Sequence, residues 1–330
     1  MTIGIVGGGA WGTALAQVIA SDGTKVLLWA HEPEVVATIN LSHTNPSFLP
    51  GINLSEKIVA TASLADIGSC EVILAVAPAQ HLGAIIGQLP RHDQPIILCS
   101  KGMEQSSGRL MNEVAVDAGW TGAIAVLSGP TFAHEVGAGL PAAVTLACAD
   151  IQVAERLAAR IARPTLRPYA SLDVIGAEIG GVVKNVLAIA CGVVDGAGLG
   201  QNARAALISR GFAEMMRYGI ARGAQMETLA GLAGLGDLVL TCSSTNSRNF
   251  SLGRGLGQGD SAQSLLANRA TIAEGAYSAG ILVEDAARHH VDMPICEAVA
   301  QLISSTITAS DAIAALLSRP LKREGWHRLG

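Results

Sequence analysis

The stretch IGIVGGGAWGTALA, residues 3–16, joins a short apolar run to a helical pattern through a cluster of glycines. Thr2–Val6 has the continuous apolar character of a strand buried on both faces. Residues 13–21 carry the small and apolar side chains of a packed helix. Between the two, Gly7, Gly9 and Gly12 satisfy the pattern G-x-G-x-x-G. A strand, a glycine turn and a helix in this order predict the first unit of a doubly wound α/β sheet.

Each glycine of the pattern has its own physical role. Gly7 permits the tight turn, Gly9 lets a pyrophosphate approach the backbone, and Gly12 allows the helix to pack closely on the strand. The free N–H groups at the N-terminus of the helix are available to the same phosphates. A glycine-rich turn without a ligand is the alternative. The surrounding strand and helix favour a dinucleotide site.

The rest of the first half repeats the alternation of apolar strands and helical segments, which predicts a mainly parallel sheet. Further strands are expected at residues 25–29, 72–76, 96–99, 123–127 and 143–147, and helices at 33–40 and 108–118. From about Ile175 the chain becomes rich in alanine with helical spacing. A chain of 330 residues is long enough for two cores. We therefore expect a Rossmann-type domain at 1–178 and an all-helical domain at 179–330.

The composition excludes several classes of protein. The formal net charge is −5, which argues against nucleic acid as a partner because a phosphate backbone requires a basic surface. Half of the residues are hydrophobic, but the best apolar run, Val186–Val194, is bounded by Lys184 and Asp195 and is shorter than a membrane span. The chain begins with a strand that the fold needs, so we expect no cleavable leader, no membrane insertion and a cytoplasmic protein.

The metal-ligating residue types are dispersed along the chain. No two of the six cysteines form a C-x-x-C pair, and the eight histidines show no ligand spacing. We expect neither a metal nor a disulfide framework. Most cysteines lie in apolar runs and are expected to be buried, inert thiols.

The choice between NAD and NADP depends on the end of the second expected strand. An acid there would bind the adenosine ribose of NAD. The strand itself ends without an acid. Glu32 stands at a suitable spacing, but Glu32-Pro33-Glu34 also has the composition of a first helical turn. His31 is placed to face a 2′-phosphate. The sequence therefore favours NADP and leaves NAD open.

Two lysines stand where chemistry is expected. Lys101 directly follows the strand at residues 96–99, so its ammonium should point into the crevice at the end of the sheet. Lys184 lies in an otherwise apolar helix beside Asn185. Burial lowers the pKa of a lysine, which suits it to exchange a proton with a carbonyl or an alcohol. The alternatives are a solvated Lys101 and a Lys184 that reaches the surface.

Polar residues elsewhere can complete a site for a phosphorylated substrate. Gly129-Pro130-Thr131 predicts a turn into a helix that could hold a polar group. Asp237 could orient Lys184 or a substrate hydroxyl, or it could cap the segment that follows. Ser247-Arg248-Asn249 offers a hydroxyl, a guanidinium and an amide, a set suited to a phosphate monoester.

Taken together, these motifs resemble the bacterial-type glycerol-3-phosphate dehydrogenases over nearly the whole chain. The resemblance rests on residues 7–16, 100–102, 127–133, 181–185, 232–242 and 247–249. It implies reversible hydride transfer from NADPH or NADH to C2 of dihydroxyacetone phosphate, giving sn-glycerol 3-phosphate for glycerophospholipid synthesis. It also implies a homodimer.

The resemblance assigns roles to particular residues. Lys184 matches the proton donor and acceptor. The implied substrate contacts are Lys101, Gly129, Thr131, Lys184, Asp237, Ser247, Arg248 and Asn249. The implied cofactor contacts are Gly7, Gly9, Ala10, Trp11, Gly12, His31, Lys101, Ala133, Arg248, Ile272 and Glu274. The family usually has serine where this chain has Ala10, so one hydroxyl contact to the pyrophosphate is missing here.

Two other functions fit parts of this pattern. The β-hydroxyacid and 6-phosphogluconate dehydrogenases share the layout, but their lysine typically stands four residues before an asparagine, whereas Lys184 and Asn185 are adjacent. A nucleotide-binding redox sensor without catalysis is the second alternative. Such a sensor has no need for a proton donor in a dry pocket.

Overall fold

The strands of the first half form one mainly parallel sheet, as expected for a Rossmann-type domain. The computed structural model describes residues 2–267 and 273–320. The strands are β1 (Thr2–Val6), β2 (Lys25–Trp29), β3 (Ile58–Thr61), β4 (Val72–Ala75), β5 (Ile96–Leu98), β6 (Ile124–Ser128), β7 (Ala142–Cys148) and β8 (Leu166–Ser171). Their spatial order is β3-β2-β1-β4-β5-β6-β7-β8. The strand order reverses at β1 and β4, which leaves a crevice at the carboxyl ends of these strands.

The sheet differs from the prediction at its edges. β3 and β8 were not expected, and β7 runs antiparallel to β6, whereas β8 is parallel to β7. Only the short helix α6 (Ala133–Gly137) lies between β6 and β7. Without a full crossover helix, the chain re-enters the sheet at the end where β6 finished, and β7 must run in the opposite direction.

Helices cover both faces of the sheet, and on each face they pack with the strands into an apolar cluster. Buried residues of α1 (Ala10–Ala20), α2 (Pro33–Ser42) and α7 (Ile151–Ile161) belong to the cluster on one face. Those of α3 (Leu64–Ile67), α4 (Ala79–Ile86) and α5 (Met111–Asp117) belong to the cluster on the other. α1 begins at Ala10, earlier than the expected start at residue 13, so Gly9 is the residue that precedes the helix.

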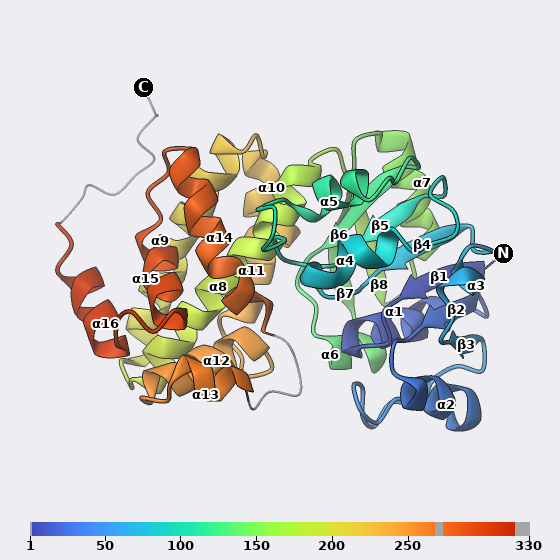
Figure 1. Cartoon of the computed structure of the whole chain (residues 1–330), viewed down its shortest axis with the longest axis horizontal. Coiled ribbons are helices and arrows are strands. Elements are labelled where there is room, and N and C mark those ends of the chain that lie inside the picture. Colours follow the sequence, from blue (N-terminus) through green and yellow to red (C-terminus); the bar gives the residue numbers. More distant parts are fainter. Residues whose placement is uncertain (1, 268–272, 321–330) are drawn as a thin grey trace.

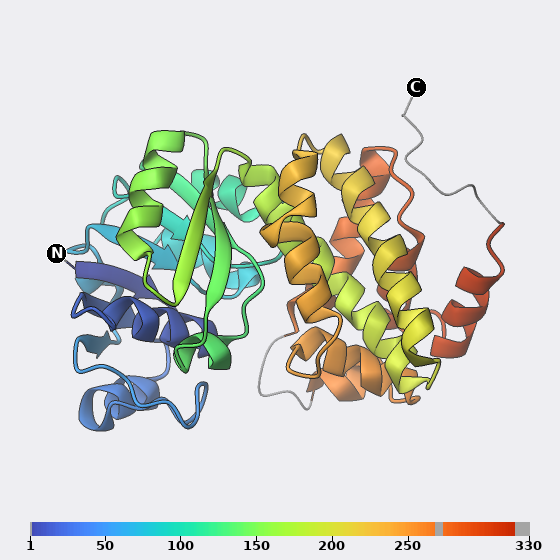
Figure 2. The same ribbon diagram turned by 180° about the vertical axis from the view of Figure 1, so that it is seen from behind.

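The second half of the described chain is helical around a central helix, as expected. α8 (Val174–Gly196) runs from the sheet into the helical group, and it continues without a break across the expected boundary at residue 178 (Figure 1). The other elements are α9 (Gly200–Ala221), α10 (Met226–Ala230), the π-helical turn η1 (Leu232–Gly236), α11 (Asp237–Thr241), α12 (Arg248–Gly257), α13 (Ala262–Ala267), α14 (Glu274–Arg288), α15 (Pro294–Ile303) and α16 (Ala309–Leu317). Figure 2 shows α9 lying alongside α8.

Glycines bring α12 into close contact with α8. A Cβ added at Gly253 of α12 would lie 1.9 Å from the carbonyl oxygen of Ile189, and one at Gly192 of α8 would lie 2.1 Å from the carbonyl oxygen of Phe250. The two helices can approach this closely only because both positions lack a side chain.

Among the described residues, one helix reaches membrane-spanning length, contrary to expectation. Residues 174–196 are long and apolar enough to cross a bilayer, and 89% of the apolar window is buried inside the protein. α8 is therefore the core helix of the second half, and its apolar side chains pack against the helices around it.

Candidate active site

The glycine cluster forms the turn between β1 and α1 at the carboxyl edge of the sheet. Gly7 adopts a φ of 128°, a conformation that favours glycine, and a Cβ there would meet the backbone of Val76, the residue after β4, at 3.0 Å. A Cβ at Gly12 would lie 1.9 Å from the carbonyl oxygen of Gly7. At Gly9 a Cβ would meet nothing within 4 Å. The backbone at Gly9 is thus open to a ligand, as a pyrophosphate site requires.

Lys184, Asp237 and Lys101 meet where α8 passes the end of the sheet. Lys184 Nζ donates to Asp237 Oδ1 at 3.0 Å, and Lys101 Nζ donates to Asp237 Oδ2 at 2.6 Å. The exposed fractions of these side chains are 9% for Lys184, 0% for Asp237 and 15% for Lys101. Lys184 therefore does not reach the surface, and Asp237 orients both ammonium groups. Two positive charges against one negative charge leave the cluster suited to an anionic ligand.

The cluster also contains a hydroxyl that sequence reasoning missed. Lys184 Nζ donates to Thr241 Oγ1 at 3.1 Å, and this hydroxyl in turn donates to Asp237 Oδ1 at 3.1 Å. Asp237 and Thr241 are the two ends of α11, which follows the π-helical turn η1. The spacing places both side chains on one helical face. Nothing in the sequence around Thr241 indicates a site residue, because a threonine in a polar stretch is common.

Burial and charge set the protonation of this cluster. Burial lowers the pKa of Lys184 from 10.5 to about 8, with Lys101 acting in the same direction and Asp237 opposing it. Burial alone would raise the pKa of Asp237, but the two neighbouring ammonium groups lower it below its ordinary value. The cluster thus holds an ionised carboxylate beside a lysine that can exchange its proton near neutral pH.

The expected turn after β6 lies beside Lys101. Lys101 Nζ also donates to the carbonyl oxygen of Gly129 at 3.0 Å, and the Thr131 hydroxyl donates to the same oxygen at 3.3 Å. Ala133 begins α6 just beyond. The buried hydroxyl of Ser128 has no hydrogen-bond partner among the described residues. It would lie 3.4 Å from a Cβ at Gly181, and the sequence placed it in the stretch after the strand without giving it a role.

Asn185 and Asn249 connect this cluster to α12 and α14. Asn185 Nδ2 donates to the carbonyl oxygen of Lys101 at 3.0 Å. Asn249 Nδ2 donates to Asn185 Oδ1 at 2.9 Å, and Asn249 Oδ1 accepts from the Gly275 N–H at 3.0 Å. The Asn249 side chain therefore bonds within the protein, where the sequence suggested a phosphate contact. That assignment stays a prediction.

The remaining predicted residues lie at the starts of helices. The Ser247 hydroxyl accepts from the Phe250 N–H at 3.2 Å and so caps α12, and Arg248 is the first residue of that helix. Glu274 begins α14, and its Oε1 accepts from the Ala79 N–H at 3.3 Å. Its Oε2 is buried without a hydrogen-bond partner in the described part of the chain. The guanidinium of Arg248 attracts the carboxyl group of Glu274 electrostatically. Ile272 lies outside the described residues.

The end of β2 carries no acidic side chain. Ala30 follows the strand, His31 is exposed, and Glu32 precedes α2 as its N-cap. The ring of His31 lies 6.3 Å from that of Trp29. The first-turn interpretation of Glu32-Pro33-Glu34 is therefore confirmed.

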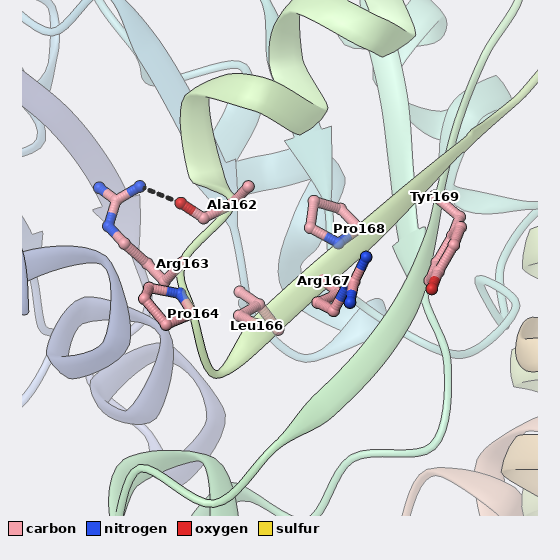
Figure 3. Close-up of a pocket in the computed structure, with 7 residues that line it drawn as sticks. All are labelled: Ala162, Arg163, Pro164, Leu166, Arg167, Pro168 and Tyr169. Atoms are coloured by element: carbon pink, nitrogen blue, oxygen red, sulfur yellow. Dashed lines mark hydrogen bonds between the residues drawn. The ribbon is translucent and has the colours of Figure 1, made fainter.

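The surface also has a hollow that is separate from the lysine cluster. It is lined by residues 162–164 and 166–169 around strand β8, and Figure 3 shows the Arg163 guanidinium bonded to the Ala162 carbonyl oxygen there. It shares no residue with the lysine cluster. Arg163 also donates to the Ile19 carbonyl oxygen and pairs with Asp22, so its role is to tie α7 to α1.

The fold and the site together define a class of protein. A glycine turn at the switch point of a doubly wound sheet, with a buried lysine and aspartate at the edge of the same sheet, is the arrangement of a nicotinamide-dependent dehydrogenase.

Comparison with known proteins gives the family. Residues 2–154 match the family described as NAD-dependent glycerol-3-phosphate dehydrogenase N-terminus, and residues 173–314 match the corresponding C-terminus. A glycerol-3-phosphate dehydrogenase [NAD(P)+] of Erythrobacter litoralis is 62% identical over 98% of this chain and 97% of its own length. That of Caulobacter vibrioides is 56% identical over 98% of both chains. The chain belongs to the NAD-dependent glycerol-3-phosphate dehydrogenase family and is an oxidoreductase.

Solved structures agree with this assignment. A crystal structure of a glycerol-3-phosphate dehydrogenase from Coxiella burnetii has a TM-score of 0.91 and 38% identity, covering 96% of this chain and 99% of that one. A D-mandelate dehydrogenase shares the fold at a TM-score of 0.64 and 15% identity, covering 95% of this chain and 99% of that one.

Proposed function

We propose that the protein catalyses reversible reduction of dihydroxyacetone phosphate to sn-glycerol 3-phosphate with NADPH or NADH, and that it supplies glycerophospholipid synthesis in the cytoplasm as a homodimer without membrane insertion. The observation that carries the proposal is the buried Lys184–Asp237–Lys101 cluster, whose Lys101 follows strand β5 at the same edge of the sheet as the glycine turn after β1. When bound, the dihydronicotinamide supplies the hydride that forms the new C–H bond at C2. The electron pair of the C2 carbonyl π bond moves to the oxygen, which takes a proton from the Lys184 ammonium, so the ketone becomes an alcohol and Lys184 becomes a neutral amine.

The remaining residues hold the two ligands in place. The open backbone at Gly9 and the N–H groups in the first turn of α1 bind the pyrophosphate. Ser247 and Arg248 at the start of α12 bind the substrate phosphate by donating hydrogen bonds to it. The Ser247 hydroxyl can do so because a hydroxyl that caps a helix still has its own hydrogen to donate. The unpartnered Oε2 of Glu274 can accept from an amide of the cofactor. The absence of an acid at the end of β2 favours NADPH over NADH.

The test is an absorbance assay of cofactor oxidation with dihydroxyacetone phosphate, run with NADPH and with NADH. We expect turnover with both and a higher kcat/KM with NADPH. Lys184→Ala should lower kcat by about 10²–10⁴-fold, the usual contribution of a general acid, while cofactor affinity is kept. Unchanged turnover in this variant would remove Lys184 from the reaction. Absence of turnover in the unmodified protein would favour a non-catalytic sensor.

A further inference from the structure

The glycine turn is held by a side chain from outside the glycine motif. Asn45 lies between α2 and β3, and its amide Nδ2 donates to the carbonyl oxygen of Gly8 at 2.9 Å. The same nitrogen donates to Thr13 Oγ1 at 2.8 Å, and the Thr13 hydroxyl donates to the Gly8 oxygen at 3.2 Å. The exposed fraction is 1% for Asn45 and 0% for Thr13. The Gly8 carbonyl oxygen is therefore fixed toward the interior by two donors.

The orientation of the Asn45 amide is set by its own turn. Its Oδ1 accepts from the Phe48 N–H at 3.3 Å, and its backbone oxygen accepts from the Leu49 N–H at 2.8 Å. The oxygen end of the amide thus faces a donor and the nitrogen end faces an acceptor, so only one orientation of the amide satisfies both. Leu49 is itself buried against Gly137 of α6, where a Cβ would meet its side chain at 3.0 Å. The turn at residues 45–49 is therefore held by its own hydrogen bonds and by the packing of Leu49 against α6.

The direction of the Gly8 carbonyl decides where the next N–H group points. In a planar trans peptide, the C=O of one residue and the N–H of the next point in opposite directions. Because Asn45 and Thr13 hold the Gly8 oxygen inward, the Gly9 N–H points the opposite way, away from these two side chains. Gly9 itself is uncrowded, since a Cβ there would meet nothing within 4 Å. Glycine residues have little conformational preference of their own, so the turn needs an external constraint to keep this peptide in one orientation.

We propose that Asn45 is a positioning residue for the cofactor: it fixes the Gly8–Gly9 peptide so that the Gly9 N–H faces the pyrophosphate before the dinucleotide binds. The inference rests on the proposed cofactor site at the glycine turn. It adds to that site a residue with no place in the G-x-G-x-x-G pattern. Pre-orienting the turn lowers the cost of ordering it on binding, so the effect of Asn45 is on cofactor affinity.

The test compares Asn45→Ala with a matched asparagine. Asn40 bonds the backbone of Ala60 with both ends of its amide, at 2.9 and 2.8 Å, so its amide is engaged away from the Gly8 carbonyl oxygen. We expect Asn45→Ala to raise the KM and the Kd for NADPH about tenfold, with kcat at saturating cofactor and the KM for dihydroxyacetone phosphate unchanged. Asn40→Ala should lower Tm without moving the cofactor constants. Equal cofactor constants in the two variants would overturn the proposal.

Two further variants keep the result interpretable. Thr13→Val retains shape and removes the hydroxyl, so it should raise the cofactor KM less than Asn45→Ala because the Asn45–Gly8 bond remains. It serves as the readout if Asn45→Ala fails to fold, and an unchanged KM would then count against the proposal. Gly12→Ala, whose Cβ would meet the Gly7 oxygen, tests the cofactor site itself. Normal NADPH binding in Gly12→Ala would overturn the proposed cofactor site. If Gly12→Ala loses NADPH binding while Asn45→Ala binds NADPH normally, only the role of Asn45 is overturned.

Discussion

At the scale of single residues, Asp237 controls the chemistry of Lys184 through charge as well as position. Its carboxylate is bonded by both lysines and is fully buried. Burial and Lys101 both lower the pKa of Lys184, and Asp237 is the largest influence that raises it. The pKa of about 8 is therefore a balance between a desolvated ammonium and a neighbouring carboxylate.

This balance predicts the pH dependence of reduction. Lys184 must be protonated to act as the acid, so kcat/KM for dihydroxyacetone phosphate should fall as the pH rises through about 8. Asp237→Asn removes the group that raises the pKa of Lys184, so the alkaline limb should move to lower pH by about one unit or more. Asp195→Asn is the control, because Asp195 lies on α8, the helix that carries Lys184, but pairs with Arg204 and Arg254. A limb that stays in place in Asp237→Asn would contradict this account.

At the scale of elements, the contact between α8 and α12 links the two ends of the proposed substrate site. Lys184 lies on α8, and Arg248 begins α12. The spacing of the helices depends on Gly253, where a Cβ would lie 1.9 Å from the carbonyl oxygen of Ile189. A backbone oxygen in a helix cannot move aside as a flexible side chain could, so the helices themselves would have to separate.

Gly253→Ala should therefore destabilise the protein by about 1–3 kcal/mol and raise the KM for dihydroxyacetone phosphate, because Arg248 moves away from Lys184. The matched control is Gly280→Ala on α14, where a Cβ meets nothing within 4 Å. That variant should be neutral or gain up to about 1 kcal/mol from helix propensity. Thermal unfolding and steady-state kinetics measure both effects. Similar stabilities for the two variants would show that the close approach is not a constraint.

The same scale shows where sequence patterns succeed and where they fail. The central strands were predicted because both of their faces are buried and their apolar runs are continuous. β3 and β8 lie at the two edges of the sheet and were missed. Val59 of β3 is 54% exposed, and β8 contains Arg167, Pro168 and an exposed Tyr169. An edge strand needs to bury fewer side chains, so its sequence resembles a loop.

Within the site, sequence position predicted the residues that follow strands or interrupt apolar helices. Lys101 and Lys184 were found in this way, and the structure brings both to Asp237. Asn45 and Thr241 have ordinary residue types in polar segments. Their hydrogen bonds to Gly8 and to Lys184 connect residues that are distant in the sequence, which no local pattern encodes.

At the scale of the whole molecule, Glu178 joins the sheet to the helical half. It lies near the start of α8, and its Oε1 accepts from the Asn112 N–H of α5 at 2.9 Å. Its Oε2 is buried without a hydrogen-bond partner in the described residues. Burial raises the pKa of Glu178 from 4.5 to about 8, with Glu113 adding to this and Arg222 and the α5 N–H groups opposing it. The junction of the two halves thus contains a carboxyl group that stays protonated at neutral pH.

A raised pKa in the folded state makes stability fall with pH. Between about pH 4.5 and 8 the folded protein holds more protons on Glu178 than the unfolded chain, so this contribution is complete at the acidic end and is lost as the pH rises through 8. Glu178→Gln keeps an oxygen for the Asn112 N–H and cannot titrate. Its Tm should exceed that of the unmodified protein increasingly from pH 5 to 8, by roughly 3 °C per pH unit at most. Glu284→Gln removes an exposed carboxylate from α14 and is the control for the loss of one carboxylate as such. A constant difference between Glu178→Gln and the unmodified protein would show that this carboxyl is already ionised at the junction.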